Sequence, residues 1–292
     1  MFEESFISLG VIYGGFYMDS VYKQEVKKYG KKDSIIAVCA VLFFVAGMEV
    51  YVAILSALQI NWETVPTFLR ELEWPIAKTA MTVLSVIIII SVTKQGLSSI
   101  GIHKENLWNA VRLGVMLSLI PIFWGVLPIV LYSGEFVGLG LFAVLLARTF
   151  LMAFAEDILF VGFLQTRLSG FFKSDKIALF VGAALFSFMH VPPWLRLGQL
   201  NFDNLSFFAL AVVVWFIMHF LLVAIYRRYN SLIPVTILHV FVNLMQNPND
   251  FWIFANGYAE YADSWAGTGV PVLIIAVSVW AFIRHRRAKK LL

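Results

Sequence analysis

Long apolar runs separated by short polar segments dominate this sequence. Eight of the runs predict helices embedded in a bilayer, at residues 34–60, 74–92, 108–132, 136–168, 177–191, 205–226, 232–246 and 269–283. A ninth run, at residues 6–18, has 13 residues, whereas a helix needs roughly 20 to cross the hydrocarbon core. The pattern predicts an all-α, multi-pass transmembrane bundle of eight or nine spans with a buried polar site.

The composition supports a membrane protein. Of the 292 residues, 60% are hydrophobic and 14% are charged, while soluble domains carry about 25% charged residues. The net charge of +4 does not point to nucleic acid, because the basic residues gather in the connections between spans. The single cysteine, Cys39, can form neither an internal disulfide nor a thiolate metal cluster.

No internal repeat or low-complexity linker divides the chain, so we expect one integrated domain. Within it, residues 1–146 supply N-terminal transmembrane helices and residues 147–247 supply a catalytic core. Residues 248–292 supply an outer loop, a last transmembrane helix and a basic tail.

Charges in the connections predict the orientation. With alternating crossings, five basic segments fall on one side: residues 20–33, 94–104, 167–176, 227–228 and 284–290. The opposite side carries acidic loops around Glu63 and Glu260. By the positive-inside rule the basic side, with the C-terminus, is cytoplasmic. The N-terminus is then outside if residues 6–18 also span. The membrane itself is an expected partner, since anionic lipids attract the basic tail.

Two adjacent carboxylates interrupt the apolar run at residues 147–170. Glu156 and Asp157 lie near its middle, where an ionised group costs several kcal/mol unless it faces the bundle interior or a water-filled cavity. The pair is therefore a candidate functional site.

Two further polar groups lie at comparable predicted depths. His190 ends a short span before two prolines, while His239 and Asn243 are one helical turn apart on one face. At 1.5 Å per helical residue, all of these side chains lie about 10–20 Å from the cytoplasmic ends of their helices. One buried site built from three helices is therefore possible.

The residue types allow two kinds of hydrolysis. A buried glutamate beside a histidine can hold and deprotonate a water, and a His–Asn pair can donate hydrogen bonds to an oxyanion. Alternatively, Glu156, His190 and His239 could bind a zinc ion with an open fourth position. The sequence has no HExxH motif, so a metal site would depend on distant residues coming together.

The three motifs resemble those of the CPBP family of intramembrane proteases, also called the CAAX protease and bacteriocin-processing, or Abi, family. They read EDILFVG from Glu156, FSFMH from Phe186 and HVFVN from His239. The flanking stretches GFLQTRL and RRYNSLIPVTILH also resemble the family, so the similarity covers residues 147–245.

The resemblance implies roles for individual residues. Glu156 and His190 would activate the hydrolytic water, while His239 and Asn243 would stabilise the oxyanion. The implied partners are a peptide or lipidated-protein substrate, CAAX-like or bacteriocin-like, and the implied cleavage lies near the cytoplasmic side. Whether such enzymes use only a glutamate or act as metalloproteases with zinc or another divalent cofactor stays open here.

Two positions depart from the family pattern. The second acid is Asp157 instead of glutamate, and we expect it to support Glu156. The family's arginine, five residues after the first glutamate, is Val161 here. Arg148, two helical turns before Glu156, is a possible substitute partner for the carboxylates.

Other functions fit parts of the pattern. The acids and histidines could hold helices together by hydrogen bonds, in a noncatalytic partner-binding or immunity factor on the same fold. A chain of Glu156, His190 and His239 could also relay protons in a proton-coupled carrier. His219 has no motif around it, so we expect a structural role.

Overall fold

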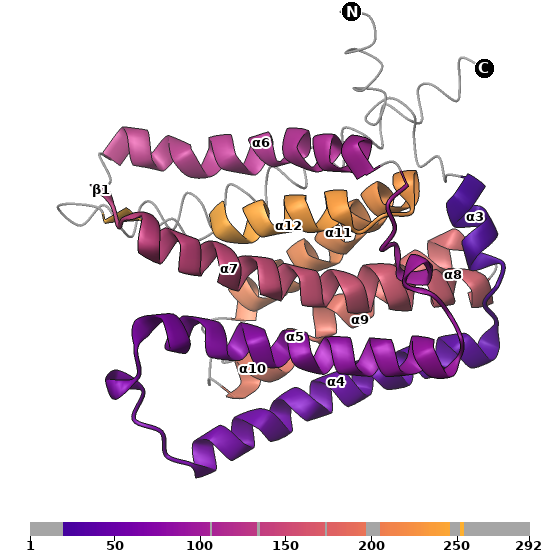
Figure 1. Ribbon diagram of the computed structural model, residues 1–292, viewed down its shortest axis with the longest axis horizontal. Helices are drawn as coiled ribbons and strands as arrows, with labels where there is room; N and C mark the ends of the chain where they lie inside the picture. The colour runs from indigo at the N-terminus through magenta and orange to yellow at the C-terminus, as the bar shows by residue number, and fades with distance from the viewer. Residues whose placement is uncertain are drawn as a thin grey trace, which may run out of the picture.

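The computed structural model describes residues 20–105, 107–132, 135–172, 174–196, 205–245 and 252–253, and this part of the chain is almost entirely helical (Figure 1). The α-helices are α3 (Ser20–Val26), α4 (Lys31–Ala57), α5 (Thr67–Val92), α6 (Leu107–Tyr132), α7 (Leu139–Glu156), α8 (Gln165–Phe172), α9 (Asp175–Phe188), α10 (Val191–Arg196), α11 (Leu205–Tyr229) and α12 (Ile233–Met245). A π-helix, η3 (Asp157–Leu164), joins α7 to α8, and η1 (Trp62–Thr64) and η2 (Leu97–Ile100) are short 3₁₀ turns. The strands β1 (Glu135–Phe136) and β2 (Trp252–Ile253) form one short antiparallel pair.

The predicted helical membrane fold is confirmed, and six of the expected spans appear as helices long and apolar enough to cross a bilayer. They are Lys31–Ala57, Thr67–Val92, Leu107–Leu127, Leu139–Phe172, Asp175–Pro193 and Phe208–Tyr229. The run predicted at residues 232–246 forms the shorter helix Ile233–Met245. The runs at residues 6–18 and 269–283 lie outside the described residues, as does the basic tail.

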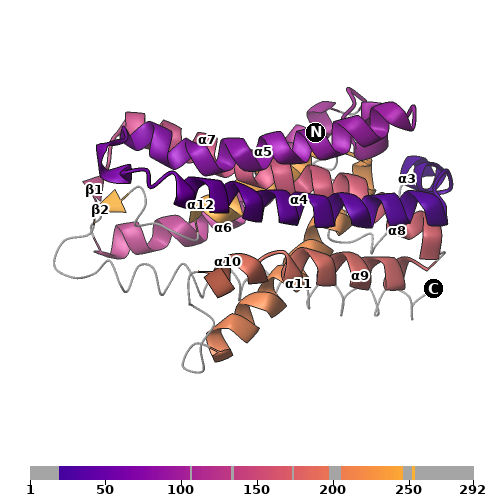
Figure 2. The same ribbon diagram turned by 90° about the horizontal axis from the view of Figure 1, so that it is seen from below.

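The helices pack in two layers. α12 lies between α6 and α7, α7 packs on α5, and α5 packs on α4, which gives the row visible in Figure 1. Behind this row, α9 packs against α8 and α11, and α10 continues from α9 (Figure 2). Because α12 is flanked by other helices and not by lipid, it can carry polar residues at little cost.

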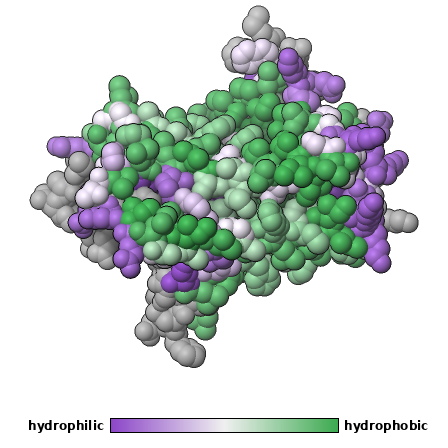
Figure 3. Space-filling model, turned by 60° about the horizontal axis from the view of Figure 1, so that its bottom comes forward, coloured by the Kyte–Doolittle hydropathy of each residue, from purple (hydrophilic) through white to green (hydrophobic). Residues whose placement is uncertain are grey.

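The outer surface suits lipid. Large hydrophobic side chains of α4, α5 and α6 are exposed, among them Phe43, Ile88 and Phe123. Figure 3 shows a broad hydrophobic surface across the middle of the molecule, with hydrophilic residues gathered toward its two ends. This distribution is the one expected where a bilayer covers the middle of the bundle.

Basic segments that are far apart in the sequence meet at one end of the bundle. Arg167 is fully buried there, and its guanidinium donates to the backbone oxygen of Ser99 at 3.0 Å and to the side chain of Gln95. The Ser34 hydroxyl donates to the backbone oxygen of Arg167 at 2.7 Å, which joins the start of α4 to the same point. The connections at residues 20–33, 94–104 and 167–176 therefore share one end, as the charge pattern predicted.

A buried tyrosine helps to fix this basic end. The Tyr29 hydroxyl donates to the carboxylate of Glu25, and its ring lies 4.3 Å from the guanidinium carbon of Arg167. Burial raises the pKa of Tyr29 above its ordinary value. The hydroxyl therefore stays protonated and remains a donor across the physiological pH range.

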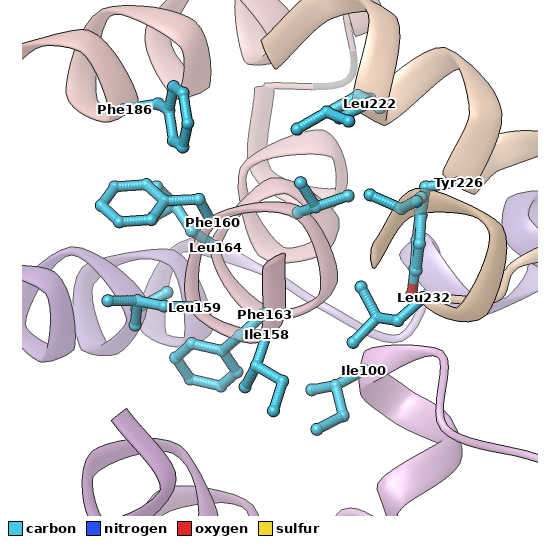
Figure 4. Close-up of a cluster of buried hydrophobic side chains, with 14 of the residues drawn as sticks. Ile100, Ile158, Leu159, Phe160, Phe163, Leu164, Phe186, Leu222, Tyr226 and Leu232 are labelled. Carbon is cyan, nitrogen blue, oxygen red and sulfur yellow. The ribbon is translucent and has the colours of Figure 1, made fainter. Parts of the chain in front are cut away.

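The π-helix η3 forms the centre of the apolar core. Figure 4 shows side chains of η3, such as Phe160 and Phe163, surrounded by residues of η2, α9 and α11 and by Leu232, which directly precedes α12. The absence of a side chain at Gly162 lets η2 approach closely, because a Cβ there would lie 2.5 Å from the backbone oxygen of Ile100. The core therefore packs tightly around η3, directly after Glu156 and Asp157.

Candidate active site

The two acids lie where the long helix changes its hydrogen-bonding pattern. Glu156 is the last residue of α7 and Asp157 is the first residue of η3. At the far end of η3, the backbone N–H of Gln165 donates to the oxygen of Phe160, five residues earlier. Such π segments are rare and occur frequently at functional sites. Both acids are buried, with 6% of Glu156 and none of Asp157 exposed.

Both carboxylates contact one imidazole. Asp157 Oδ1 lies 3.0 Å from His239 Nδ1, and Glu156 Oε2 lies 3.6 Å from His239 Nε2. Asp157 is also held by the Thr236 hydroxyl, which donates to Oδ2 at 2.8 Å. Because a carboxylate can only accept, His239 Nδ1 carries the proton in its bond to Asp157. Asp157 thereby fixes the ring and leaves Nε2 directed toward Glu156.

A cation from another helix completes the surroundings of Glu156. Lys78 of α5 is 7% exposed, and its ammonium forms a salt bridge with Glu156 Oε1. The two oxygens of this carboxylate therefore have different neighbours, Lys78 at Oε1 and His239 at Oε2.

His190 lies in the turn between α9 and α10, with one ring nitrogen occupied. Its Nδ1 donates to the backbone oxygen of Phe186 at 2.9 Å, one helical turn earlier. Its ring stacks on Trp215 of α11, with 4.1 Å between centroids and 15° between planes. The tautomer set by the Phe186 bond leaves a lone pair on Nε2. His190 can therefore accept a hydrogen bond from a water or substrate.

One cavity of about 370 Å³ brings the predicted residues together. Its lining includes the four side chains with predicted catalytic roles: Glu156, His190, His239 and Asn243. They come from α7, the α9–α10 turn and α12. Asp157 does not line the cavity and lies behind His239. The arrangement can hold a small polar reactant between a carboxylate, an imidazole lone pair and two further polar side chains.

Charged side chains form part of the cavity rim. The carboxylate of Glu49, on α4, accepts two hydrogen bonds of 3.0 Å from Arg196 at the end of α10. The Arg196 guanidinium also lies 5.7 Å from the ring centre of Trp74. Arg196 and Glu49 are 30% and 40% exposed, so this part of the rim is accessible.

The family model described as type II CAAX prenyl endopeptidase Rce1-like matches residues 138–245. This segment is therefore similar to the Rce1-like domains of the CAAX protease family. The resemblance carried by the three motifs is thereby confirmed, and the match supports a membrane protease of the CAAX endopeptidase type. No curated protein matches the chain closely.

The Rce1-like domain begins just before α7 and ends with α12, so it holds the acids, both histidines and Asn243. Lys78 lies outside it, on α5. The sequence pattern missed Lys78, although a signal was present. It is the only charged residue in the predicted span at residues 74–92, and an intramembrane cation normally marks a partner or a function.

Arg148, predicted as a substitute partner for the carboxylates, lies on α7 and forms a 2.6 Å salt bridge with Glu71 of α5. The position of the family's arginine, Val161, is fully buried in the apolar core. His219, expected to be structural, is buried, and its Nε2 lies 3.1 Å from Gln165 Oε1.

The ligands proposed for zinc do not fit a metal site as they stand. Within the described residues, no three His, Cys, Asp or Glu side chains are grouped so that they could hold a metal ion. Lys78 already binds Oε1 of Glu156, so in this arrangement only Oε2 of that carboxylate is open to a cation.

Proposed function

We propose that this chain is an intramembrane endopeptidase that hydrolyses a peptide bond with water activated by Glu156 and His190. The observation that carries the proposal is that both side chains line one cavity with His239 and Asn243. Such a site needs a base, an acceptor that orients the water, and donors for the developing negative charge. Glu156, His190, His239 and Asn243 would supply these parts, and they come from α7, the α9–α10 turn and α12.

The first step forms a bond between the water oxygen and the carbonyl carbon. His190 Nε2 accepts one hydrogen bond from the water, and Glu156 takes its other proton as the nucleophile attacks. The carbonyl oxygen becomes an oxyanion. The Asn243 amide donates to that oxygen, and His239 donates from Nε2 in its doubly protonated, imidazolium form, while Asp157 keeps the His239 ring in place at 3.0 Å.

The second step breaks the bond between the carbonyl carbon and the amide nitrogen. The tetrahedral intermediate collapses, and Glu156 returns its proton to the leaving amine. The products are a carboxylic acid on one fragment and a free amine on the other, so atoms and charge balance without a covalent enzyme intermediate.

An apolar peptide, such as a lipidated CAAX-like or bacteriocin-like segment, is the proposed substrate. Four methionines contribute to the cavity lining: Met48, Met152, Met189 and Met218. Methionine is flexible and polarizable, so a lining rich in it adapts to irregular apolar groups. The family match adds the expectation of a prenylated C-terminal peptide.

The direct test is cleavage of a prenylated CAAX-type peptide by the purified protein in lipid vesicles, followed by mass spectrometry. The wild-type protein should release a C-terminal fragment, and His190→Ala should reduce the rate by about 100-fold or more. His103→Ala is the matched control, since His103 contacts the backbone oxygen of Asn230 at 2.7 Å and is absent from the cavity lining. Equal rates in both variants would contradict the role of His190.

The charged rim predicts the side from which substrate enters. Glu49 is 18 residues after Lys31 on α4, so it lies about 27 Å from the basic end. If the basic end is cytoplasmic, the Glu49–Arg196 rim is near the opposite face. We therefore propose entry from that face, which differs from the cytoplasmic side expected from the sequence.

Labelling in intact cells tests this sidedness without measuring cleavage. In a Cys39→Ser background, a membrane-impermeant maleimide should modify Glu49→Cys in intact cells. Lys32→Cys, at the basic end, should react only after the cells are opened. The reverse pattern would place the rim on the cytoplasmic side.

A further inference from the structure

Lys78 is a buried cation that the Rce1-like domain does not itself contain. Its side chain is 9% exposed, and its ammonium pairs with Glu156, which is 6% exposed. A buried lysine is costly unless it is paired and hydrogen-bonded. A leucine or methionine at this position would avoid the cost of burying the ammonium but would leave Glu156 without its cation, so the charge of Lys78 serves the carboxylate.

The pair has a defined geometry. Lys78 holds Oε1 of Glu156, while Oε2 lies 3.6 Å from His239 Nε2, and both Lys78 and Glu156 line the cavity. The ammonium therefore limits rotation of the carboxylate and balances its charge. We propose that Lys78 is a positioning residue that keeps Glu156 ionised and holds it in the orientation needed to accept a proton from water. This inference rests on the proposed function.

The neighbouring contacts explain why α5 can supply the cation. Thr79, next to Lys78, donates through its hydroxyl to the backbone oxygen of Leu151 on α7 at 3.0 Å. This bond fixes the position of α5 along α7 less than two turns before Glu156. Val161, five residues after Glu156, is fully buried among apolar side chains and has no charge to offer. The N-terminal helices thus provide a part of the site that the matched segment lacks.

A stability cycle tests the pairing without any need for activity. Lys78→Met and Glu156→Gln are made singly and together, and thermal unfolding is measured in the same detergent or lipid. Removing one partner leaves the other buried and unpaired, whereas removing both leaves a neutral pair. Lys78→Met should lower the unfolding midpoint, and the double variant should recover most of the loss.

The pair formed by Lys28 and Glu25 is the matched control cycle. These residues are joined by a salt bridge of 2.7 Å, but the Lys28 side chain is 65% exposed. Lys28→Met and Glu25→Gln should therefore show little coupling, since exposed pairs are weak. Additive midpoint shifts for Lys78 and Glu156 would overturn the proposed pairing, even if the protein proved inactive on every peptide tried.

The kinetics of peptide cleavage distinguish a positioning role of Lys78 from a purely structural role. Lys78→Met should reduce kcat by about 100-fold with little change in KM, because the other lining residues still contact the substrate while Glu156 is no longer held in position. Lys78→Arg should recover much of this loss, since it restores the cation, and Lys28→Met should match the wild-type protein. A wild-type kcat in Lys78→Met, or no recovery in a folded Lys78→Arg, would overturn the positioning role.

Discussion

Replacing Glu156 by glutamine should reduce peptide cleavage by about 10³-fold while the protein remains folded. The amide keeps the size of the side chain but cannot take a proton from water, and general-base catalysis contributes about 10²–10⁴-fold. The loss should appear in kcat, because no contact with the substrate backbone is removed. Single-turnover cleavage of the prenylated peptide, with enzyme in excess, measures the chemical step directly.

Glu25→Gln is the control for Glu156→Gln. Glu25 is also a buried glutamate bonded to a lysine, but it lies at the basic end and not in the cavity. Its substitution should leave the cleavage rate within a few-fold of the wild-type value. If Glu156→Gln retained that rate as well, another base would have to be found and the mechanism would be wrong.

The four residues of the candidate site that line the cavity could be selected from sequence because each carried a local signal. Two adjacent acids in an apolar helix are costly, and His239 and Asn243 share a face through their four-residue spacing. Helical rise alone placed these groups at similar depths. The membrane helices were predictable for the same reason, since apolar length is a property of single segments.

The contacts between distant segments were harder to predict. Lys78 precedes Glu156 by 78 positions, and whether its side chain faces lipid or protein depends on the rotation of α5 against α7. Periodicity gives little guidance on this point, because a membrane helix is apolar on both its lipid face and its core face. Arg148 illustrates the difficulty. Its spacing of two helical turns from Glu156 made it a candidate partner for the two carboxylates, whereas in the structure it forms a salt bridge with Glu71.

The π-helix could not be predicted either. An α-helix places residues three and four apart on one face, and the apolar pattern of residues 147–170 predicts an α-helix throughout. The π segment has hydrogen bonds to residues five apart. It therefore changes which side chains of η3 face each neighbour. Apolar composition does not distinguish the two, because every position from Ile158 to Leu164 is buried.

Replacing Gly162 by alanine should destabilise the protein, although alanine normally favours a helix. In an open helical position the change would stabilise by roughly 0.5–1 kcal/mol. At Gly162 the new Cβ would lie 2.5 Å from the backbone oxygen of Ile100 and 3.2 Å from a methyl carbon of Leu232. Overpacking of this kind typically costs about 1–3 kcal/mol, and a backbone atom cannot move aside as a flexible side chain can.

Gly140→Ala provides the matched measurement, since a Cβ at Gly140 in α7 would meet no atom within 4 Å. Its unfolding midpoint should be unchanged or raised, while that of Gly162→Ala should fall. Displacement of η2 would also strain the 3.0 Å bond from Arg167 to the backbone oxygen of Ser99. Exchange protection of the backbone amides at residues 97–102 should therefore fall in Gly162→Ala alone. Equal midpoints in the two variants would show that η2 does not pack against η3 as closely as described.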